Sequence, residues 1–122
     1  MNDPQKCFEE AKRFAETLDS LDILINNAGV SQRVPFIDFD MDSCINLINT
    51  NCLSHIALIK AFLPLLKRCH KEDRGHARII NISSLAGLMG VGVRTCYAAS
   101  KFGISGFSRA LRSEVKKDGI MV

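Results

Sequence analysis

The residues from 84 to 101 include three side chains whose types and spacing suit acid–base chemistry. Tyr97, the only tyrosine in the chain, lies thirteen residues after Ser84 and four residues before Lys101. If this segment is helical, Tyr97 and Lys101 project from the same face about one turn apart. An ammonium group beside a phenol stabilises the phenolate, which suits a tyrosine to proton transfer in a shielded site. The same pair on an exposed helix would contribute only about 0.2–0.5 kcal/mol, so the neighbouring motifs decide between these interpretations.

The composition indicates a single globular domain and argues against several kinds of partner. The chain has 122 residues, of which 47% are hydrophobic and 24% charged, and its net charge is +3. These values are ordinary for globular proteins, and no run of lysine and arginine marks a nucleic-acid surface. No apolar run reaches the ~20 residues of a membrane span, and the N-terminus lacks the apolar segment of a signal peptide.

The cysteines are odd in number and scattered, which argues against a disulfide framework. They are Cys7, Cys44, Cys52, Cys69 and Cys96. Their spacing matches no metal site and contains no CxxC motif, so we expect no bound metal. The pattern predicts reduced, mostly buried thiols in a reducing compartment. We therefore expect a cytoplasmic protein, or one at the endoplasmic reticulum membrane if a preceding segment carries an anchor.

Hydrophobic periodicity predicts that helices and strands alternate along the chain. The expected helices cover residues 4–18, 40–70 and 96–117, and the expected strands cover residues 21–26, 77–82 and 120–122. Strands joined by helical crossovers form a parallel, doubly wound sheet that is covered on both faces. A polar loop is expected at residues 70–76, and Gly119 is expected to end the last helix. Both ends look truncated, because no strand precedes the first helix and the last strand stops early.

The long helical region at residues 40–70 is expected to be interrupted. Asn49, Thr50 and Asn51 are poor helix formers, which predicts a break or bulge near Asn51. Such a break frees backbone groups that can hold water or a ligand. Pro64 predicts a kink or a change of direction. The rest of this region is apolar enough to require packing against the sheet or a second subunit.

Polar and small residues follow the first two predicted strands. Residues 26–29 have the sequence Asn-Asn-Ala-Gly, and Ser84 lies just past the second strand. Ligands of open parallel sheets bind outside the carboxyl ends of the strands, although an Asn–Gly stretch can also be a plain turn. Gly87, Gly90 and Gly92 suit a loop that lines a substrate pocket, or one that simply needs positive φ.

Five motifs, in this order and spacing, resemble those of the short-chain dehydrogenase/reductase family. They are NNAG at 26–29, INTN ending at Asn51, LP at 63–64, NISS ending at Ser84, and YAASK at 97–101. The resemblance covers essentially the whole chain. It implies an α/β fold with a doubly wound parallel sheet, Rossmann-like and three-layered (α/β/α), truncated at both ends. Residues 1–122 would then form one incomplete domain.

The resemblance also implies a role for each matching residue. Tyr97 would be the acid–base residue, and Ser84 would hydrogen-bond the substrate oxygen. Lys101 would assist Tyr97 and hold the ribose next to the nicotinamide, and Asn51 would keep a water that relays protons to Lys101. The residues that would border the cofactor are Asn26, Ala28, Gly29, Tyr97 and Lys101.

Several elements of the family pattern are missing from this chain. The glycine-rich TGxxxGxG turn that receives the cofactor pyrophosphate does not occur. The residue that separates NAD from NADP is absent too, so the cofactor is expected to be NADP or NAD. We expect the isolated chain to be unstable or inactive and a full-length parent to be the active enzyme.

The sequence is compatible with two functions. The first is an oxidoreductase that transfers hydride between a nicotinamide cofactor and a carbonyl or secondary alcohol. Apolar residues around the glycine-rich loop favour a lipid, steroid or retinoid-like substrate, although they would also suit a core: Leu85, Leu88, Met89, Val91 and Val93. The second is a catalytically inactive form that associates through helices 40–70 and 96–117. The family uses these helices as subunit interfaces, so a homo-oligomer is expected for the full-length protein.

Overall fold

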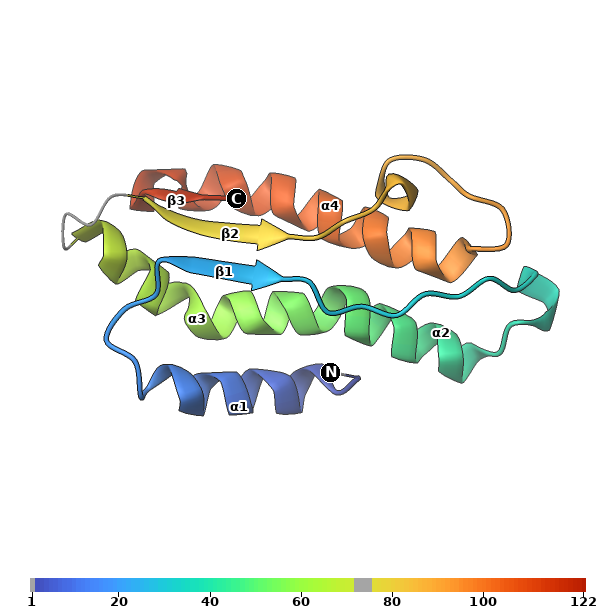
Figure 1. Cartoon of the computed structure of the whole chain (residues 1–122), viewed down its shortest axis with the longest axis horizontal. Helices are drawn as coiled ribbons and strands as arrows, with labels where there is room; N and C mark the ends of the chain where they lie inside the picture. Colours follow the sequence, from blue (N-terminus) through green and yellow to red (C-terminus); the bar gives the residue numbers. More distant parts are fainter. Residues whose placement is uncertain (1, 72–75) are drawn as a thin grey trace.

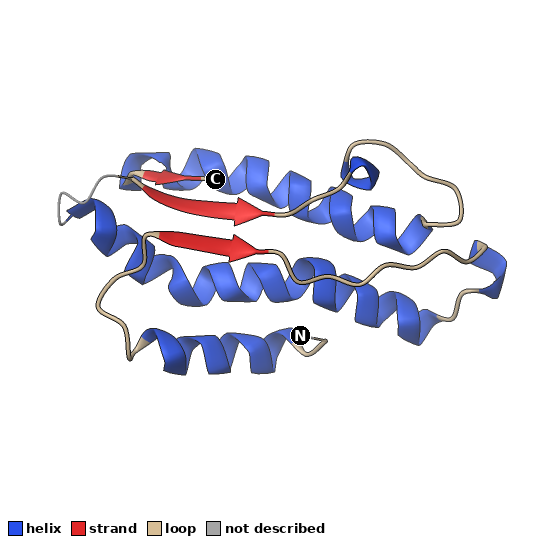
Figure 2. Cartoon of the chain, viewed as in Figure 1, coloured by secondary structure: helices blue, strands red, loops and turns tan. Residues whose placement is uncertain are grey.

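The computed structural model describes residues 2–71 and 76–122, in which helices and strands alternate (Figures 1 and 2). The helices are α1 (Pro4–Ala15), α2 (Met41–Ile48), α3 (Ser54–Lys71) and α4 (Thr95–Val115), and the strands are β1 (Ile23–Asn26), β2 (Ala77–Asn81) and β3 (Ile120–Met121). Short 3-10 turns cover Phe36–Asp38, Leu85–Gly87 and Lys116–Asp118. The predicted order of elements is confirmed, with small shifts of their boundaries. Residues 72–75 of the predicted polar loop lie outside the described residues.

The sheet is parallel, with β2 between β1 and β3. Ile25 of β1 pairs with Ile80 of β2, and Ala77 of β2 pairs with Ile120 of β3. The crossovers contain α3 and α4, and this type of connection produces parallel pairing. The carboxyl ends of β1 and β2 therefore lie at the same edge of the sheet, as their arrows show (Figure 2).

The described helices cover only one face of the sheet. The main core cluster joins this face to α3 and α4 through Ile59, Leu66, Cys69, Ala77, Ile79, Leu111, Val115 and Ile120. Alternate strand residues point the other way: Ile23 is 45% exposed, Ile25 59% and Ile80 39%. The prediction that both faces are covered is therefore wrong for the described residues, since α3 and α4 pack on the side of Ile79. The arrangement agrees with a truncated α/β/α fold in which one helical layer is present.

Capping groups determine where the helices begin and end. The carboxylate of Asp3 accepts a hydrogen bond from a first-turn N–H of α1, and Pro4 follows it. The carboxylate of Asp40 accepts from the Ser43 N–H at 2.7 Å and caps α2. This bond favours the ionised form and lowers the pKa of Asp40. Gly119 follows the last turn with φ of 69°, as predicted for a C′ glycine.

The long helical region is interrupted where the sequence predicts it. Residues Asn49–Leu53 form a π-helical turn between α2 and α3, and we call it the π turn. The polar residues there compete for backbone hydrogen bonds, which favours such a bulge. Pro64 lies inside α3, and the helix continues past it to Lys71.

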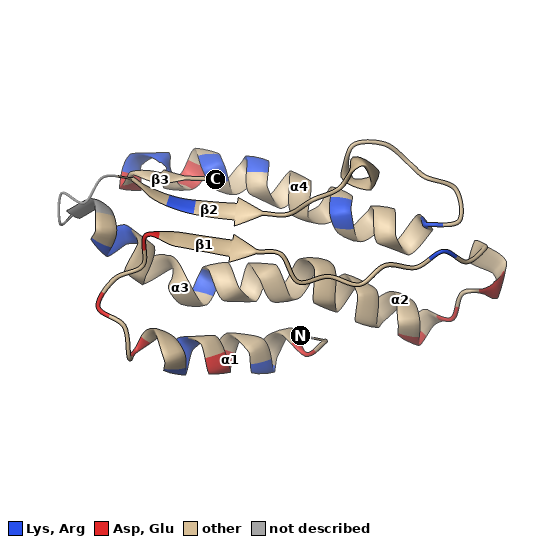
Figure 3. Cartoon of the chain, viewed as in Figure 1, with Lys and Arg blue, Asp and Glu red and all other residues tan. Residues whose placement is uncertain are grey.

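Charged residues of both signs occur on α1 and α4, whereas those of α3 are all basic (Figure 3). Acidic and basic side chains alternate along α1, and the described residues form no continuous basic stripe (Figure 3). Within the described part of the chain, no helix combines the length and the apolar character that crossing a membrane requires.

Cys44 and Cys96 form a disulfide, which corrects the prediction of reduced cysteines. Their Cα atoms lie 5.7 Å apart, within the range that a disulfide requires. The bond joins α2 to the first turn of α4. The two cysteines are 52 residues apart in sequence, so only the packing of α2 against α4 brings them together. Cys52 remains a buried thiol, and burial raises its pKa against the opposing effect of Lys101.

We predict that this disulfide stabilises the folded chain. A cross-link that closes a loop of this size contributes about 2–4 kcal/mol to the free energy of unfolding. Urea unfolding of the oxidised protein and of the Cys44→Ala/Cys96→Ala variant, followed by circular dichroism, should differ by that amount. Cys7→Ala serves as the control, because Cys7 takes no part in the disulfide. Equal unfolding midpoints for the oxidised protein and the double variant would contradict the prediction.

Candidate active site

A cleft of about 210 Å³ lies past the carboxyl ends of β1 and β2, beside the first turns of α4. It is lined by Asn27, Gly29, Val30 and Ser31 after β1, by Ile82 and Ser83 after β2, and by Tyr97 and Lys101 on α4. Ligands of open parallel sheets bind at this edge. The cleft brings part of the Asn-Asn-Ala-Gly stretch next to the Tyr97–Lys101 pair.

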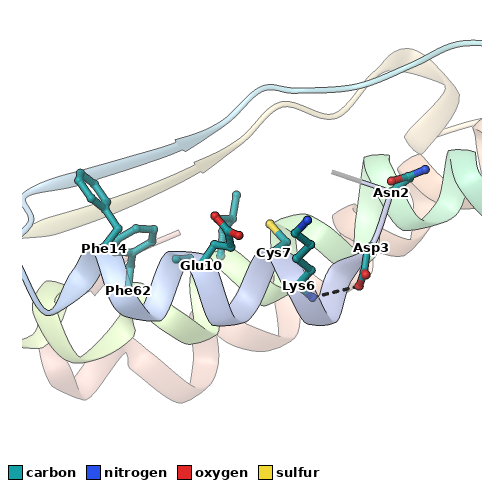
Figure 4. A pocket seen from close by; sticks show the side chains of 9 residues that line it. Asn2, Asp3, Lys6, Cys7, Glu10, Phe14 and Phe62 are labelled. Carbon is teal, nitrogen blue, oxygen red and sulfur yellow. Dashed lines mark hydrogen bonds between the residues drawn. The ribbon is translucent and has the colours of Figure 1, made fainter.

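A larger hollow of about 620 Å³ lies elsewhere, between α1 and α3 (Figure 4). Phe14 and Phe62 meet there edge to face, with ring centroids 6.3 Å apart. Lys6, Cys7 and Glu10 line it from α1. The described residues around this hollow include no member of the predicted acid–base set. The smaller cleft is therefore the candidate active site.

Tyr97 and Lys101 lie one turn apart on α4, as their spacing predicts. The Nζ atom of Lys101 lies 5.8 Å from the centroid of the Tyr97 ring. The lysine is only 4% exposed, and its ammonium donates a hydrogen bond of 2.8 Å to the carbonyl oxygen of Ile82. A buried ammonium group needs such partners. This bond fixes the charged end of Lys101 at the end of β2, inside the cleft.

Asn51, in the π turn, is fully buried and connects three segments. Its side-chain amide donates to the Val30 carbonyl at 2.8 Å and to Ser100 Oγ at 3.2 Å, and its Oδ1 accepts from the Val30 N–H at 2.8 Å. Gly29 lies against this amide. A Cβ atom at position 29 would be 3.2 Å from Asn51 Oδ1 and 3.8 Å from Lys101 Nζ. Glycine thus allows the loop to approach both side chains closely.

Ser84 lies at the same edge of the sheet but does not line the cleft. Its Oγ accepts a hydrogen bond of 3.2 Å from the Ala86 N–H and caps the 3-10 turn that follows β2. A hydroxyl that accepts in this way still has its proton to donate. The neighbouring Ser83 does line the cleft, and its Oγ lies 2.7 Å from Ser105 Oγ of α4.

Asn26 is buried beneath the cleft and does not line it. Its amide donates to Asn81 Oδ1 at 2.8 Å across the β1–β2 pair, and Asn81 in turn donates to Ser108 Oγ at 2.8 Å. These bonds connect the ends of both strands to α4. Of the three residues expected to border the cofactor from this turn, Gly29 lines the cleft, whereas Asn26 and Ala28 do not.

His55 is a buried residue of the site that the sequence analysis did not identify. Its Nε2 lies 2.8 Å from the Ala28 carbonyl oxygen, so the ring fixes the backbone between Asn26 and Gly29. Its Nδ1 is buried and has no hydrogen-bond partner among the described residues. Burial lowers the pKa of His55; the Ala28 bond opposes this shift and Lys101 adds to it. The one signal in the sequence is its position one helical turn after Asn51.

Two cations flank the ring of Tyr97. The guanidinium carbon of Arg94, a residue that the sequence analysis also missed, lies 5.7 Å from the ring centroid, and the Lys101 ammonium lies at 5.8 Å. The site therefore combines a hydroxyl proton donor with the ammonium of Lys101, and a second cation lies at its edge. Such a set can protonate an oxygen atom that becomes negatively charged during a reaction.

The chain is similar in sequence and fold to several known proteins. The family model for short chain dehydrogenase matches residues 1–122. Bovine dehydrogenase/reductase SDR family member 7B is 35% identical over 120 residues, which cover 98% of this chain and 35% of the bovine protein.

Two solved structures have the same fold over this segment. A metagenomic short-chain oxidoreductase in complex with NADP matches with a TM-score of 0.84 and 28% identity, over 98% of this chain and 51% of that one. An NADH-dependent reductase in complex with NAD matches with a TM-score of 0.85 and 27% identity, over 98% of this chain and 50% of that one. The chain thus spans between about a third and about a half of the length of these relatives.

We predict that His55 makes stability depend on pH. Its pKa in the folded state lies below the ordinary value of about 6.5. Below pH ~6.5 the unfolded chain binds a proton that the folded chain does not, so the free energy of unfolding falls as the pH falls. The loss is at most about 1.4 kcal/mol per pH unit. His55→Asn should flatten this slope in urea unfolding measured at a series of pH values.

His76→Asn provides the matched control, because His76 is exposed. The dependence is assigned to His55 if the slope is flatter in His55→Asn than in His76→Asn. If His55→Asn instead keeps the wild-type slope between about pH 6.5 and pH 5, another group causes the dependence.

Proposed function

Because the chain belongs to the short-chain dehydrogenase family, we propose that it provides the acid–base half of a nicotinamide-dependent oxidoreductase. The reaction transfers hydride between the cofactor and a carbonyl compound or secondary alcohol. The observation that carries the proposal is the cleft at the carboxyl ends of β1 and β2, where Tyr97 lies beside the buried ammonium of Lys101.

The residues around the cleft suit the nicotinamide end of such a cofactor. Position 29 has no side chain, so the space beside Asn51 and Lys101 stays open. The Lys101 ammonium is a hydrogen-bond donor whose position is fixed by its bond to Ile82. Asn27, Gly29, Ser83 and Lys101 would hold the cofactor here, and the bound cofactor would supply or accept the hydride. We propose NADP or NAD as this cofactor, because similar structures were solved in complex with each of them.

Each residue of the set has a distinct proposed role. The Tyr97 hydroxyl gives its proton to the substrate oxygen as hydride reaches the carbon, and takes a proton from the alcohol in the reverse direction. The Ser84 hydroxyl donates a hydrogen bond to the same oxygen. The Lys101 ammonium stabilises the phenolate that Tyr97 leaves behind. Asn51 holds Val30 and Ser100 beside Lys101. It would also hold a water that relays protons to Lys101.

The loop after β2 supports an apolar substrate. Leu85 is 66% exposed, Leu88 64%, Met89 55% and Val93 40%. These side chains follow Ser84 and precede Tyr97, so they belong to the segment that leads from one proposed catalytic group to the other. Their exposure favours a lipid, steroid or retinoid-like carbonyl compound.

The second candidate function is association without catalysis. Ile45 of α2 is 49% exposed, Leu53 of the π turn 42% and Phe102 of α4 45%. Exposed apolar side chains on helices are typical of subunit contacts. In an active full-length protein the same surfaces would join subunits of a homo-oligomer. Chemical cross-linking combined with an activity assay separates the two candidates, because an oligomer that reduces no carbonyl supports association alone.

We predict that Tyr97→Phe abolishes carbonyl reduction in a polypeptide that contains the complete dehydrogenase domain. Loss of a positioned proton donor lowers turnover by about 10²–10⁴-fold. Nicotinamide binding, followed by fluorescence quenching, should change by less than about threefold, because the ring remains. Ser113→Ala is the control, since it removes an exposed hydroxyl from the same helix. Unchanged turnover of Tyr97→Phe would overturn the proposed mechanism.

A further inference from the structure

Arg94 is the N-cap residue of α4 and contacts the candidate site on two sides, at Ser31 in the loop after β1 and at Tyr97 on α4. Its guanidinium donates a hydrogen bond of 3.1 Å to Ser31 Oγ and lies 5.7 Å from the ring centroid of Tyr97. Ser31 lines the cleft together with Tyr97. The guanidinium is therefore held at the edge of the cleft, close to the proposed proton donor.

The backbone around Arg94 holds it in this position. Val93 has φ of 56°, a left-handed conformation that is strained for a β-branched residue. The carbonyl of Val93 accepts a hydrogen bond of 3.0 Å from the Val34 N–H, which fastens this loop to the one after β1. Strain of this kind persists only where the surroundings determine the conformation, and it is frequent at binding sites.

The guanidinium of Arg94 lacks an anionic partner among the described residues. The ion pairs there are Arg13–Glu10 and Lys67–Asp118. A guanidinium has five N–H donors in a planar fork, and the bond to Ser31 uses one of them. Arg94 is half-buried as a whole residue, and its bond to Ser31 lies at the exposed edge of the cleft, so its remaining donors can be reached by a ligand. This geometry is suited to a carboxylate, which guanidinium groups bind with two parallel hydrogen bonds.

A second cavity adjoins this position and is lined by no acidic side chain of the described residues, although the Asp40 carboxylate binds the N–H of Ser43 at its margin. It measures about 240 Å³ and is lined by Val30, Ser31, Gln32, Phe39, Ser43, Asn46 and Leu47. Val30 and Ser31 also line the candidate active site, so the two spaces meet beside the partner of Arg94. The Oε1 atom of Gln32 is buried there and has no hydrogen-bond partner among the described residues. The cavity has room for a substrate group that extends beyond the reacting carbonyl.

We propose that Arg94 and Ser31 bind the carboxylate of the substrate, so that the substrate is an oxo acid and the product the corresponding hydroxy acid. This inference rests on the proposed function. The reaction adds one hydride to the carbonyl carbon and one proton, from Tyr97, to its oxygen. The reduced nicotinamide is oxidised, and the carboxylate is unchanged. An apolar chain against Leu85 and Leu88 agrees with the same substrate, which is then an amphipathic oxo acid.

The test compares an oxo fatty acid with its methyl ester in a polypeptide that contains the complete dehydrogenase domain. The wild-type protein should reduce the acid with a kcat/KM at least about tenfold above that of the ester. Arg94→Gln should lower kcat/KM for the acid by about 10–100-fold, mainly through KM, because a charge-assisted hydrogen-bonded pair is lost. The ester should change by less than about threefold. Arg94→Lys keeps the charge without the planar fork and should recover part of the activity toward the acid.

Arg33→Gln is the matched control, because it removes an exposed arginine from the same loop as Ser31. This variant should leave the preference for the acid unchanged. A wild-type preference for the ester, or an equal loss with acid and ester in Arg94→Gln, would overturn the carboxylate site.

Calorimetric binding of the oxo acid to Tyr97→Phe separates this inference from the proposed function. The variant should bind the acid, and adding Arg94→Gln should weaken that binding by about tenfold or more. If binding depends on Arg94 but the wild-type protein reduces neither compound, the proposed function fails and the carboxylate site stands. If binding is the same with and without Arg94, the carboxylate site fails whatever the activity.

Discussion

The hydrogen bond between the Lys101 ammonium and the Ile82 carbonyl is the interaction on which the candidate site depends. The side chain is 4% exposed, and an ammonium in that position without a partner would be strongly unfavourable. The bond therefore fixes α4 against the end of β2 and sets the position of Tyr97 one turn earlier. Gly87 permits the turn after β2 to approach α4 closely, and Gly103 permits α4 to approach the π turn. A Cβ at Gly87 would lie 2.8 Å from the Lys101 carbonyl oxygen, and one at Gly103 would lie 3.1 Å from Cys52 Sγ.

A second group of bonds holds the loop after β1 over the same end of α4. Asn51 binds both backbone polar groups of Val30, and His55 binds the carbonyl of Ala28. Both side chains come from one continuous helical segment, and the π turn places Asn51 so that it also reaches Ser100. Burial removes the hydrogen bonds that these polar atoms would make to water, and the bonds within the protein take their place. The buried side chains of Asn51 and His55 thus determine the position of the loop that forms one wall of the cleft.

Charge and apolar surface are distributed differently around the site and on the sheet. Two cations lie near the Tyr97 ring, whereas the residues that line the second cavity beside Ser31 carry no charged side chain. Developing negative charge on a substrate oxygen is stabilised most where the surroundings are shielded from water. The opposite situation holds on the uncovered face of the sheet, where Ile23 and Ile25 are solvated. Apolar side chains in that environment contribute little to stability.

Local chemistry made much of this molecule predictable from its sequence. Helical periodicity, the Asp40 cap, the C′ glycine at 119 and the polar residues around Asn51 are short-range signals. They predicted the succession of helices and strands along the chain and the break in the helix near Asn51. The i, i+4 spacing alone placed Tyr97 beside Lys101. The Cys44–Cys96 disulfide and the exposed sheet face depended on packing between distant segments. The contacts of His55 and Arg94 with the loop after β1 also depended on such packing. Only the tertiary structure decided these features, because they join residues that are far apart in the sequence.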